Sequence, residues 1–294
     1  LRYGENPQQK AIALVNDNSF IQVCGEKKLS YNNLLDLDAA INIAYGMNTK
    51  KNICTIIKHN IPCGAAIKEN QIAAYKKALG GDKLSAFGGI VSFNKKLDIK
   101  TAKELAKHFF EVVAAPNYGK GVIEVLKKNK NLRVLKISKN KSSIEQRSFF
   151  AGTLIQESNN KISNIKTIYG KNSLGKEQST FFINVLKFIK SNAIAIFDQN
   201  SLISQSGGQT SRIDAIKNCV DKLKSKHQLK DNQKVFLFSD AFFPFTDSIA
   251  YVLKSKINID IYAPMGSRND EKIINFVQNN KTNFFCLSYR HFKH

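Results

Sequence analysis

A lysine and a histidine stand side by side where an apolar run ends, at Lys58 and His59. The turn formers Pro62 and Gly64 follow within a few residues. An apolar run bounded in this way predicts a buried strand over residues 53–58. Ligands of open α/β sheets bind at strand ends, so a cation and an imidazole there can act as acid and base on one substrate. Taken alone, such a pair is more often a solvated strand end.

The same segment argues against zinc. His59, Pro62 and Cys63 approach the zinc deaminase pattern H-x-E with P-C-x-x-C, but Ile61 replaces the catalytic glutamate and Ala66 replaces the second cysteine. A catalytic zinc ion needs three protein ligands and an open position for water. We therefore expect no metal-activated water here.

Three further segments offer groups that a ligand could meet. Residues 85–89 hold two glycines, whose backbone can approach a ligand, and Phe87, whose ring can stack. Residues 190–192 end a predicted helix and place the Asn192 amide near a second crevice. Residues 207–212 lead into a helix, so free N–H groups and Arg212 can hold an anion. For each glycine segment the alternative is a plain tight connection.

Aromatic residues gather directly after a predicted strand, in residues 239–245. Three phenylalanines and a proline at a loop position indicate a flat apolar slot for an aromatic ring. A buried corner of the core is the alternative. After the last predicted strand, Arg290 adds a guanidinium suited to bidentate phosphate binding.

Residues 170–176 have the spacing of a phosphate-binding loop, G-x-x-x-x-G-K. That loop needs a Ser or Thr hydroxyl next, to bind magnesium, whereas this chain has Glu177. A carboxylate facing a triphosphate would repel it, so we interpret the segment as a linker.

Composition limits the class of protein without choosing a ligand. The 294 residues include 45 Lys and Arg against 23 Asp and Glu, a net charge of +22, and 43% are hydrophobic. Such a chain is globular and favours anionic partners, although lysines spread along the sequence also fit a compositional bias of the source. Five scattered cysteines and the lack of an apolar run of about 20 residues predict a soluble protein of the reducing cytoplasm.

Strand and helix patterns alternate, which predicts an α/β fold with two units of similar size. In the first unit we expect strands at 53–58, 89–93, 112–115 and 132–137, and helices at 71–79, 101–110 and 121–128. In the second we expect helices at 179–191, 211–226, 246–254 and 270–279, and strands at 193–197, 235–238, 259–262 and 283–287. Periodicity fades between residues 139 and 176, so the predicted domains are 1–145 and 146–294.

Together these segments resemble one family. The matching segments, in chain order, are residues 1–9, 58–64, 85–89, 190–194, 208–214, 239–245 and 290–294. Over nearly its whole length the chain resembles the AICAR transformylase domain of the bifunctional purine biosynthesis protein. The resemblance implies two tandem cytidine-deaminase-like α/β subdomains without the zinc site, and a homodimer with shared active sites. It also implies that the family's N-terminal IMP cyclohydrolase domain is absent from this chain.

The resemblance further implies formyl transfer from 10-formyltetrahydrofolate to the 5-amino group of AICAR, which gives FAICAR in de novo purine biosynthesis. The family pattern makes Lys58, His59 and Asn192 catalytic. It places Arg2, Tyr3, Gly88, Glu111, Arg212, Phe242 and Arg290 around the nucleotide. It places Leu84, Phe87, Ile213, Pro244 and Phe245 around the folate. It implies no zinc and is compatible with a monovalent cation.

Some residues depart from the family pattern. Gln9 stands where His is frequent, Ile61 replaces a more usual Asn, Glu111 stands where Asp also occurs, and residues 263–267 depart from Gln-Pro-Gly-Gly-Ser. None of these removes a proposed catalytic group. The competing hypothesis is a non-catalytic basic α/β module that binds RNA or other polyanions. Aromatic residues clustered with Gly and Pro in loops favour the enzyme, so we expect neither a nucleic-acid nor a membrane partner.

Overall fold

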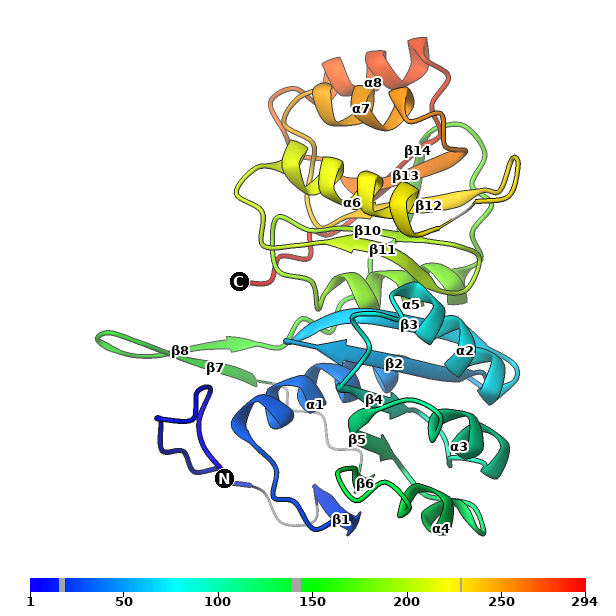
Figure 1. Ribbon diagram of the computed structural model, residues 1–294. Helices are drawn as coiled ribbons and strands as arrows, with labels where there is room; N and C mark the ends of the chain where they lie inside the picture. Colours follow the sequence, from blue (N-terminus) through cyan, green and yellow to red (C-terminus); the bar gives the residue numbers. More distant parts are fainter. Residues whose placement is uncertain (16–18, 139–143, 228) are drawn as a thin grey trace.

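The computed structural model describes residues 1–15, 19–138, 144–227 and 229–294. Within these ranges it contains two six-stranded mixed sheets and one two-stranded hairpin (Figure 1). The predicted α/β class is confirmed. Within the same ranges, no helix has both the length and the apolar character needed to cross a membrane.

The first sheet is built from a hairpin, three parallel strands and an antiparallel edge strand, in the order β3-β2-β4-β5-β6-β1. Its strands are β1 (Phe20–Cys24), β2 (Asn52–Lys58), β3 (Ile61–Lys68), β4 (Gly89–Phe93), β5 (Phe110–Ala115) and β6 (Arg133–Ile137). Its helices are α1 (Tyr31–Ala44), α2 (Gln71–Gly81), α3 (Ile99–Leu105) and α4 (Val122–Leu126).

The second sheet repeats this topology position by position, in the order β11-β10-β12-β13-β14-β9. Its strands are β9 (Ile165–Tyr169), β10 (Ile194–Phe197), β11 (Leu202–Ser206), β12 (Val235–Ser239), β13 (Ile259–Pro264) and β14 (Phe284–Leu287). Its helices are α5 (Lys176–Leu186), α6 (Arg212–Lys226), α7 (Asp247–Lys254) and α8 (Asp270–Asn279). Between the two units, β7 (Ile144–Phe149) and β8 (Gly152–Glu157) form the separate hairpin.

The two sheets share a central core that contains α1 and α5 (Figure 1). Phe182 of α5 stacks on Phe197 at a centroid distance of 4.2 Å. The Asn184 amide donates to the Ile43 carbonyl of α1 at 2.8 Å. Two outer cores lie beneath α2–α4 and α6–α8 respectively. The two units are therefore packed against each other through buried side chains as well as joined by the chain.

The prediction of a turn over residues 59–64 was wrong beyond its first two residues, because β3 begins at Ile61. Pro62 lies beside a register shift in the β2–β3 ladder, where a missing N–H is tolerated. Gly64 is required by close packing, since a Cβ there would lie 2.0 Å from the Ala78 carbonyl oxygen of α2. Pro62 and Gly64 therefore belong to a strand that lies beneath a tightly packed helix, and they do not mark a turn.

Two other boundaries and several elements also differ from the predictions. The helix expected over 101–110 is α3, which ends at Leu105, and the helix expected over 179–191 is α5, which ends at Leu186. The stretch 139–176, where we expected the domain boundary and no regular element, holds β7, β8 and β9, while its residues 139–143 lie outside the described residues. The elements β1, α1 and β11 had not been predicted.

Candidate functional site

The sequence-predicted Lys58 lies on one edge of the first sheet, together with the first residues of three neighbouring strands. Because β2 runs antiparallel to β4, its last residues lie beside the beginning of β4, where Ile57 pairs with Ile90. The parallel strands β5 and β6 begin at the same edge. The fold therefore brings Lys58, Gly88, Glu111 and Arg133 into one row.

The turn after β2 presents His59. His59 and Asn60 have φ values of 54° and 60°, the left-handed conformation of a two-residue hairpin loop. The backbone N–H of Asn60 donates to the Asp36 carboxylate of α1. Burial raises the pKa of Asp36, while backbone hydrogen bonds from Asn60 and His59 oppose the rise. Asp36 thus anchors the turn and leaves the His59 side chain exposed.

The loop before β4 comes close to Lys58. Gly88 has φ of +69°, and its N–H donates to the Phe109 carbonyl at 2.9 Å. A Cβ built on Gly88 would lie 3.0 Å from the Lys58 ammonium nitrogen. The ammonium therefore lies directly against this glycine, where a Cβ would crowd it.

Glu111 and a buried arginine continue the row. One Glu111 oxygen accepts from the Asn33 amide at 2.9 Å and from Arg133 Nη1 at 3.5 Å. The Arg133 side chain is 2% exposed, and burial lowers its pKa. The charge of Arg2 lowers that pKa further, which places Arg2 near the same edge. Arg2 donates to the hydroxyl of Tyr3 at 2.8 Å.

On this edge of the first unit, the structure thus gathers six of the sequence-predicted residues, Arg2, Tyr3, Lys58, His59, Gly88 and Glu111. Sequence reasoning missed Asp36, Asn33 and Arg133. Of these, Arg133 had a usable signal, because it lies at the start of the predicted strand 132–137, and Glu111 directly precedes the predicted strand 112–115.

A second group surrounds Asn192 in the other unit. The Asn192 side-chain amide donates to the Gln209 carbonyl at 2.9 Å, and its oxygen accepts from Arg212 Nη2 at 2.9 Å. Arg212 is buried and also donates to the Asp240 carboxylate and to the Ala193 carbonyl. In this structure Arg212 orients the Asn192 amide. A remaining N–H of that amide can serve a ligand.

The C-terminal tail runs past this group. The Ser191 N–H donates to the Lys293 carbonyl at 2.8 Å, and the His291 N–H donates to the Asp240 carbonyl at 2.8 Å. Burial lowers the pKa of Lys293, while the Asp38 carboxylate of α1 opposes the change. The exposed Arg290 guanidinium lies 5.2 Å from the Phe292 ring centroid. The tail of the second unit therefore lies within electrostatic range of the helix that anchors the His59 turn.

The residues predicted to shape the folate slot form two groups. Leu84 and Phe87 line a cavity of about 480 Å³, where Phe87 lies 5.0 Å from the Phe109 ring. All residues that line this cavity belong to the first unit. Ile213, Pro244 and Phe245 lie in the second unit, with Phe245 63% exposed.

The phenylalanine-rich loop is only partly a surface feature. Phe243 is 2% exposed and packs against Phe284 of the outer core, so for this ring the core alternative is correct. Phe242 is half-buried, and the Pro244 carbonyl accepts from the Asn269 amide at 2.8 Å. The rings left to meet a ligand are Phe242 and Phe245.

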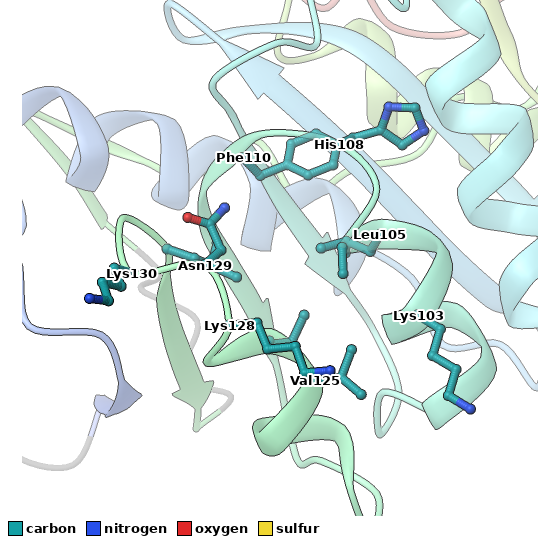
Figure 2. Close-up of a pocket in the computed structure, with 11 residues that line it drawn as sticks. Lys103, Leu105, His108, Phe110, Val125, Lys128, Asn129 and Lys130 are labelled. Carbon is teal, nitrogen blue, oxygen red and sulfur yellow. The ribbon is translucent and has the colours of Figure 1, made fainter.

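A larger cavity, of about 540 Å³, opens between the ends of α3 and α4 (Figure 2). It shares His108 and Phe110 with the aromatic cavity. Lys103 and Lys130 point away from one another, so their ammonium groups do not converge on one ligand (Figure 2). Over the described ranges, no three His, Cys, Asp or Glu side chains gather in a way that could hold a metal ion.

Comparison with known proteins gives consistent matches. A family model described as AICARFT/IMPCHase bienzyme matches residues 1–222. The chain is 36% identical over 308 residues to the bifunctional purine biosynthesis protein PurH of Persephonella marina. It is 38% identical over 306 residues to the PurH protein of Fusobacterium nucleatum and 38% identical over 307 residues to that of Clostridium perfringens. These alignments cover 100% of the chain and 58% to 59% of each relative.

Proposed function

Because the chain belongs to the AICARFT/IMPCHase bienzyme family, we propose that it transfers the formyl group of 10-formyltetrahydrofolate to the 5-amino group of AICAR. The products are FAICAR and tetrahydrofolate. The observation that carries this proposal is the placement of Lys58 and His59 on one sheet edge beside Gly88 and Glu111. The chain spans about three fifths of the relatives it matches, so the transfer step alone is proposed for it.

The chemistry explains why a base and a cation are needed. The AICAR amine shares its lone pair with an imidazole that carries a carboxamide, so it is a poor nucleophile. His59, with the neighbouring carboxamide, takes the amine proton as the nitrogen bonds to the formyl carbon. Lys58 stabilises the negative charge that develops on the formyl oxygen. As the bond from that carbon to the folate nitrogen breaks, Lys58 helps to protonate the departing nitrogen.

Asn192 supplies a hydrogen-bond donor whose direction is fixed by its neighbours. Its oxygen is held by Arg212, and one of its N–H groups is held by Gln209, so the other N–H has a fixed direction. That N–H orients the substrate carboxamide or donates to the formyl oxygen. Arg212 contributes to nucleotide binding through this amide.

The basic edge of the first unit suits the nucleotide. Arg2, Tyr3 and Arg290 hold the phosphate and ribose, while Gly88, Glu111 and Phe242 surround the base. The buried Arg133 supports this arrangement, because it fixes Glu111 and lies within electrostatic range of Arg2. No step in this scheme requires zinc or a monovalent cation.

The folate site is proposed to form between two copies of the chain. Leu84 and Phe87 would meet Ile213, Pro244 and Phe245 across a homodimer interface, so that each active site draws on two copies. The separation of these residues into two groups on one chain supports such sharing.

We further propose that residues 1–145 and 146–294 are cytidine-deaminase-like subdomains, which the identical strand order of the two sheets supports.

The test is the formation of tetrahydrofolate, followed spectrophotometrically with the purified protein. Formation that depends on added AICAR is the expected result. The competing polyanion-binding module predicts no transfer and tight, steeply salt-dependent binding to unrelated RNA. Both measurements on one preparation decide between the two functions.

A further inference from the structure

A buried carboxylate joins the two units at the end of α2. Asp82 is 5% exposed and directly follows this helix. One of its oxygens accepts from Lys226 Nζ at 2.7 Å and from Lys222 Nζ at 3.2 Å, both on α6 of the second unit. At the same junction, the His227 ring lies 3.0 Å from the Gly81 carbonyl oxygen and donates to it. The contact is therefore a network between units.

The same carboxylate holds the loop that carries Leu84, Phe87 and Gly88. The Ser85 N–H donates to Asp82 at 3.2 Å, and the Ser85 hydroxyl donates to it at 2.8 Å. Burial by itself would raise the pKa of Asp82, but the hydrogen bonds from Lys226, Ser85 and Lys222 outweigh burial and lower it to about 2. Asp82 is thus charged at neutral pH and accepts hydrogen bonds from residues of both units.

Helix α6 connects this network to the second half of the site. Arg212, which orients Asn192, is the first residue of α6, and Lys226 is the last. At a rise of about 1.5 Å per residue, the 15-residue helix spans about 22 Å. A rigid element therefore runs from the Asn192 amide to the loop that lies against Lys58.

We propose that Asp82 is a positioning residue, which fixes the 83–88 loop of the first unit to α6 of the second and thereby sets Leu84, Phe87 and Gly88 in place. This inference rests on the proposed formyl transfer for its kinetic consequence. Its structural consequence is independent of turnover, because the loop should loosen whenever the carboxylate is neutralised.

Hydrogen exchange measured by mass spectrometry on residues 83–89 of the ligand-free protein tests the structural part. In Asp82→Asn the exchange of this peptide should accelerate about tenfold or more, since hydrogen bonds to a charged acceptor are lost. Lys226→Met should act in the same direction. Lys224→Met removes an exposed lysine of the same helix and should leave the exchange unchanged.

Steady-state kinetics on the same variants test the consequence for the site. Asp82→Asn and Lys226→Met should raise the KM for 10-formyltetrahydrofolate about tenfold and lower kcat by a smaller factor. Ser85→Ala removes one hydroxyl and should show both effects more weakly, so it replaces Asp82→Asn if that variant does not fold. Unchanged exchange of the 83–89 peptide in Asp82→Asn would overturn the proposal. If Asp82→Asn does not fold, unchanged exchange in both Ser85→Ala and Lys226→Met would overturn it instead. An equal acceleration of exchange in the control Lys224→Met would also overturn it. Wild-type protein without formyl transfer would refute the proposed function, whereas the exchange data would still decide the role of Asp82.

Discussion

The ammonium of Lys58 occupies the space that a side chain on Gly88 would need. A Cβ on Gly88 would lie 3.0 Å from Lys58 Nζ and 3.4 Å from the nearer atom of the Phe109 ring. The position of the proposed oxyanion-stabilising cation therefore depends on the lack of a side chain at the start of the neighbouring strand. This relationship links a backbone feature to the chemistry of the site.

Substituting Gly88 by alanine tests that link. Gly88→Ala should lower kcat by about ten- to a hundredfold, because Lys58 must move from its position. Gly121→Ala is the matched control, since Gly121 also has positive φ, at +77°, but meets only the Ile99 side chain at 3.6 Å. Each variant should lose about 1 kcal/mol of unfolding free energy from backbone strain. Equal kcat values in the two variants would show that crowding at Lys58 has no catalytic effect.

Removing the Asn192 amide should be more damaging than removing a surface amide. Asn192→Ala should lower kcat by a factor of about 10² to 10³, the usual cost of one oxyanion-type donor. The measurement is the single-turnover rate of formyl transfer. Asn218→Ala, on the exposed face of α6, should leave the rate unchanged. A loss of less than threefold in Asn192→Ala would remove Asn192 from the catalytic centre.

Arg133 should contribute to the stability of the fold as well as to the proposed nucleotide site. Its replacement in Arg133→Met removes one donor from Glu111 and one donor from each of the carbonyls of Lys27 and Lys28. We expect a loss of about 2 to 3 kcal/mol in urea unfolding. Arg268 is exposed, and Arg268→Met should change the unfolding free energy by less than about 0.5 kcal/mol. Equal losses in both variants would contradict the structural role of Arg133.

Stability should fall in mild acid because of His291. Burial, followed by the charge of Lys187, lowers the pKa of His291 to about 4. The unfolded chain binds a proton near pH 6.5 while folded His291 stays neutral, so the unfolding free energy drops as the pH falls from about 6.5 to 4. The full effect is roughly 3 kcal/mol. His291→Gln should flatten this part of a plot of Tm against pH, and an unchanged slope would refute the assignment.

Several elements of the fold were predictable because their apolar runs are short and bounded. The strands β2, β4 and β12 lie within one residue of their predicted limits. Helix α5 was harder, because Phe181, Phe182 and Ile183 are all fully buried between two sheets, which removes the one-sided pattern of a surface helix. The hairpin of β7 and β8 was missed because its residues are exposed and mostly polar.

The site was predictable where residues that are close in the sequence also lie together in the site. Lys58 and His59 follow one strand, and Leu84, Phe87 and Gly88 share one loop. Asp36 and Asn33 were not predictable, since only the packing of α1 brings them to the hairpin turn and to Glu111. Asp82 belongs to the same class, because its partners Lys222 and Lys226 are more than a hundred residues away.

The central claim is that His59 activates the AICAR amine. The most direct measurement compares tetrahydrofolate formation by the wild-type protein and by His59→Ala, with AICAR and 10-formyltetrahydrofolate present and with circular dichroism as the check on folding. The account predicts AICAR-dependent turnover in the wild type and a loss of about 10² to 10⁴ in a folded His59→Ala variant. Turnover by the folded variant at the wild-type rate would contradict it.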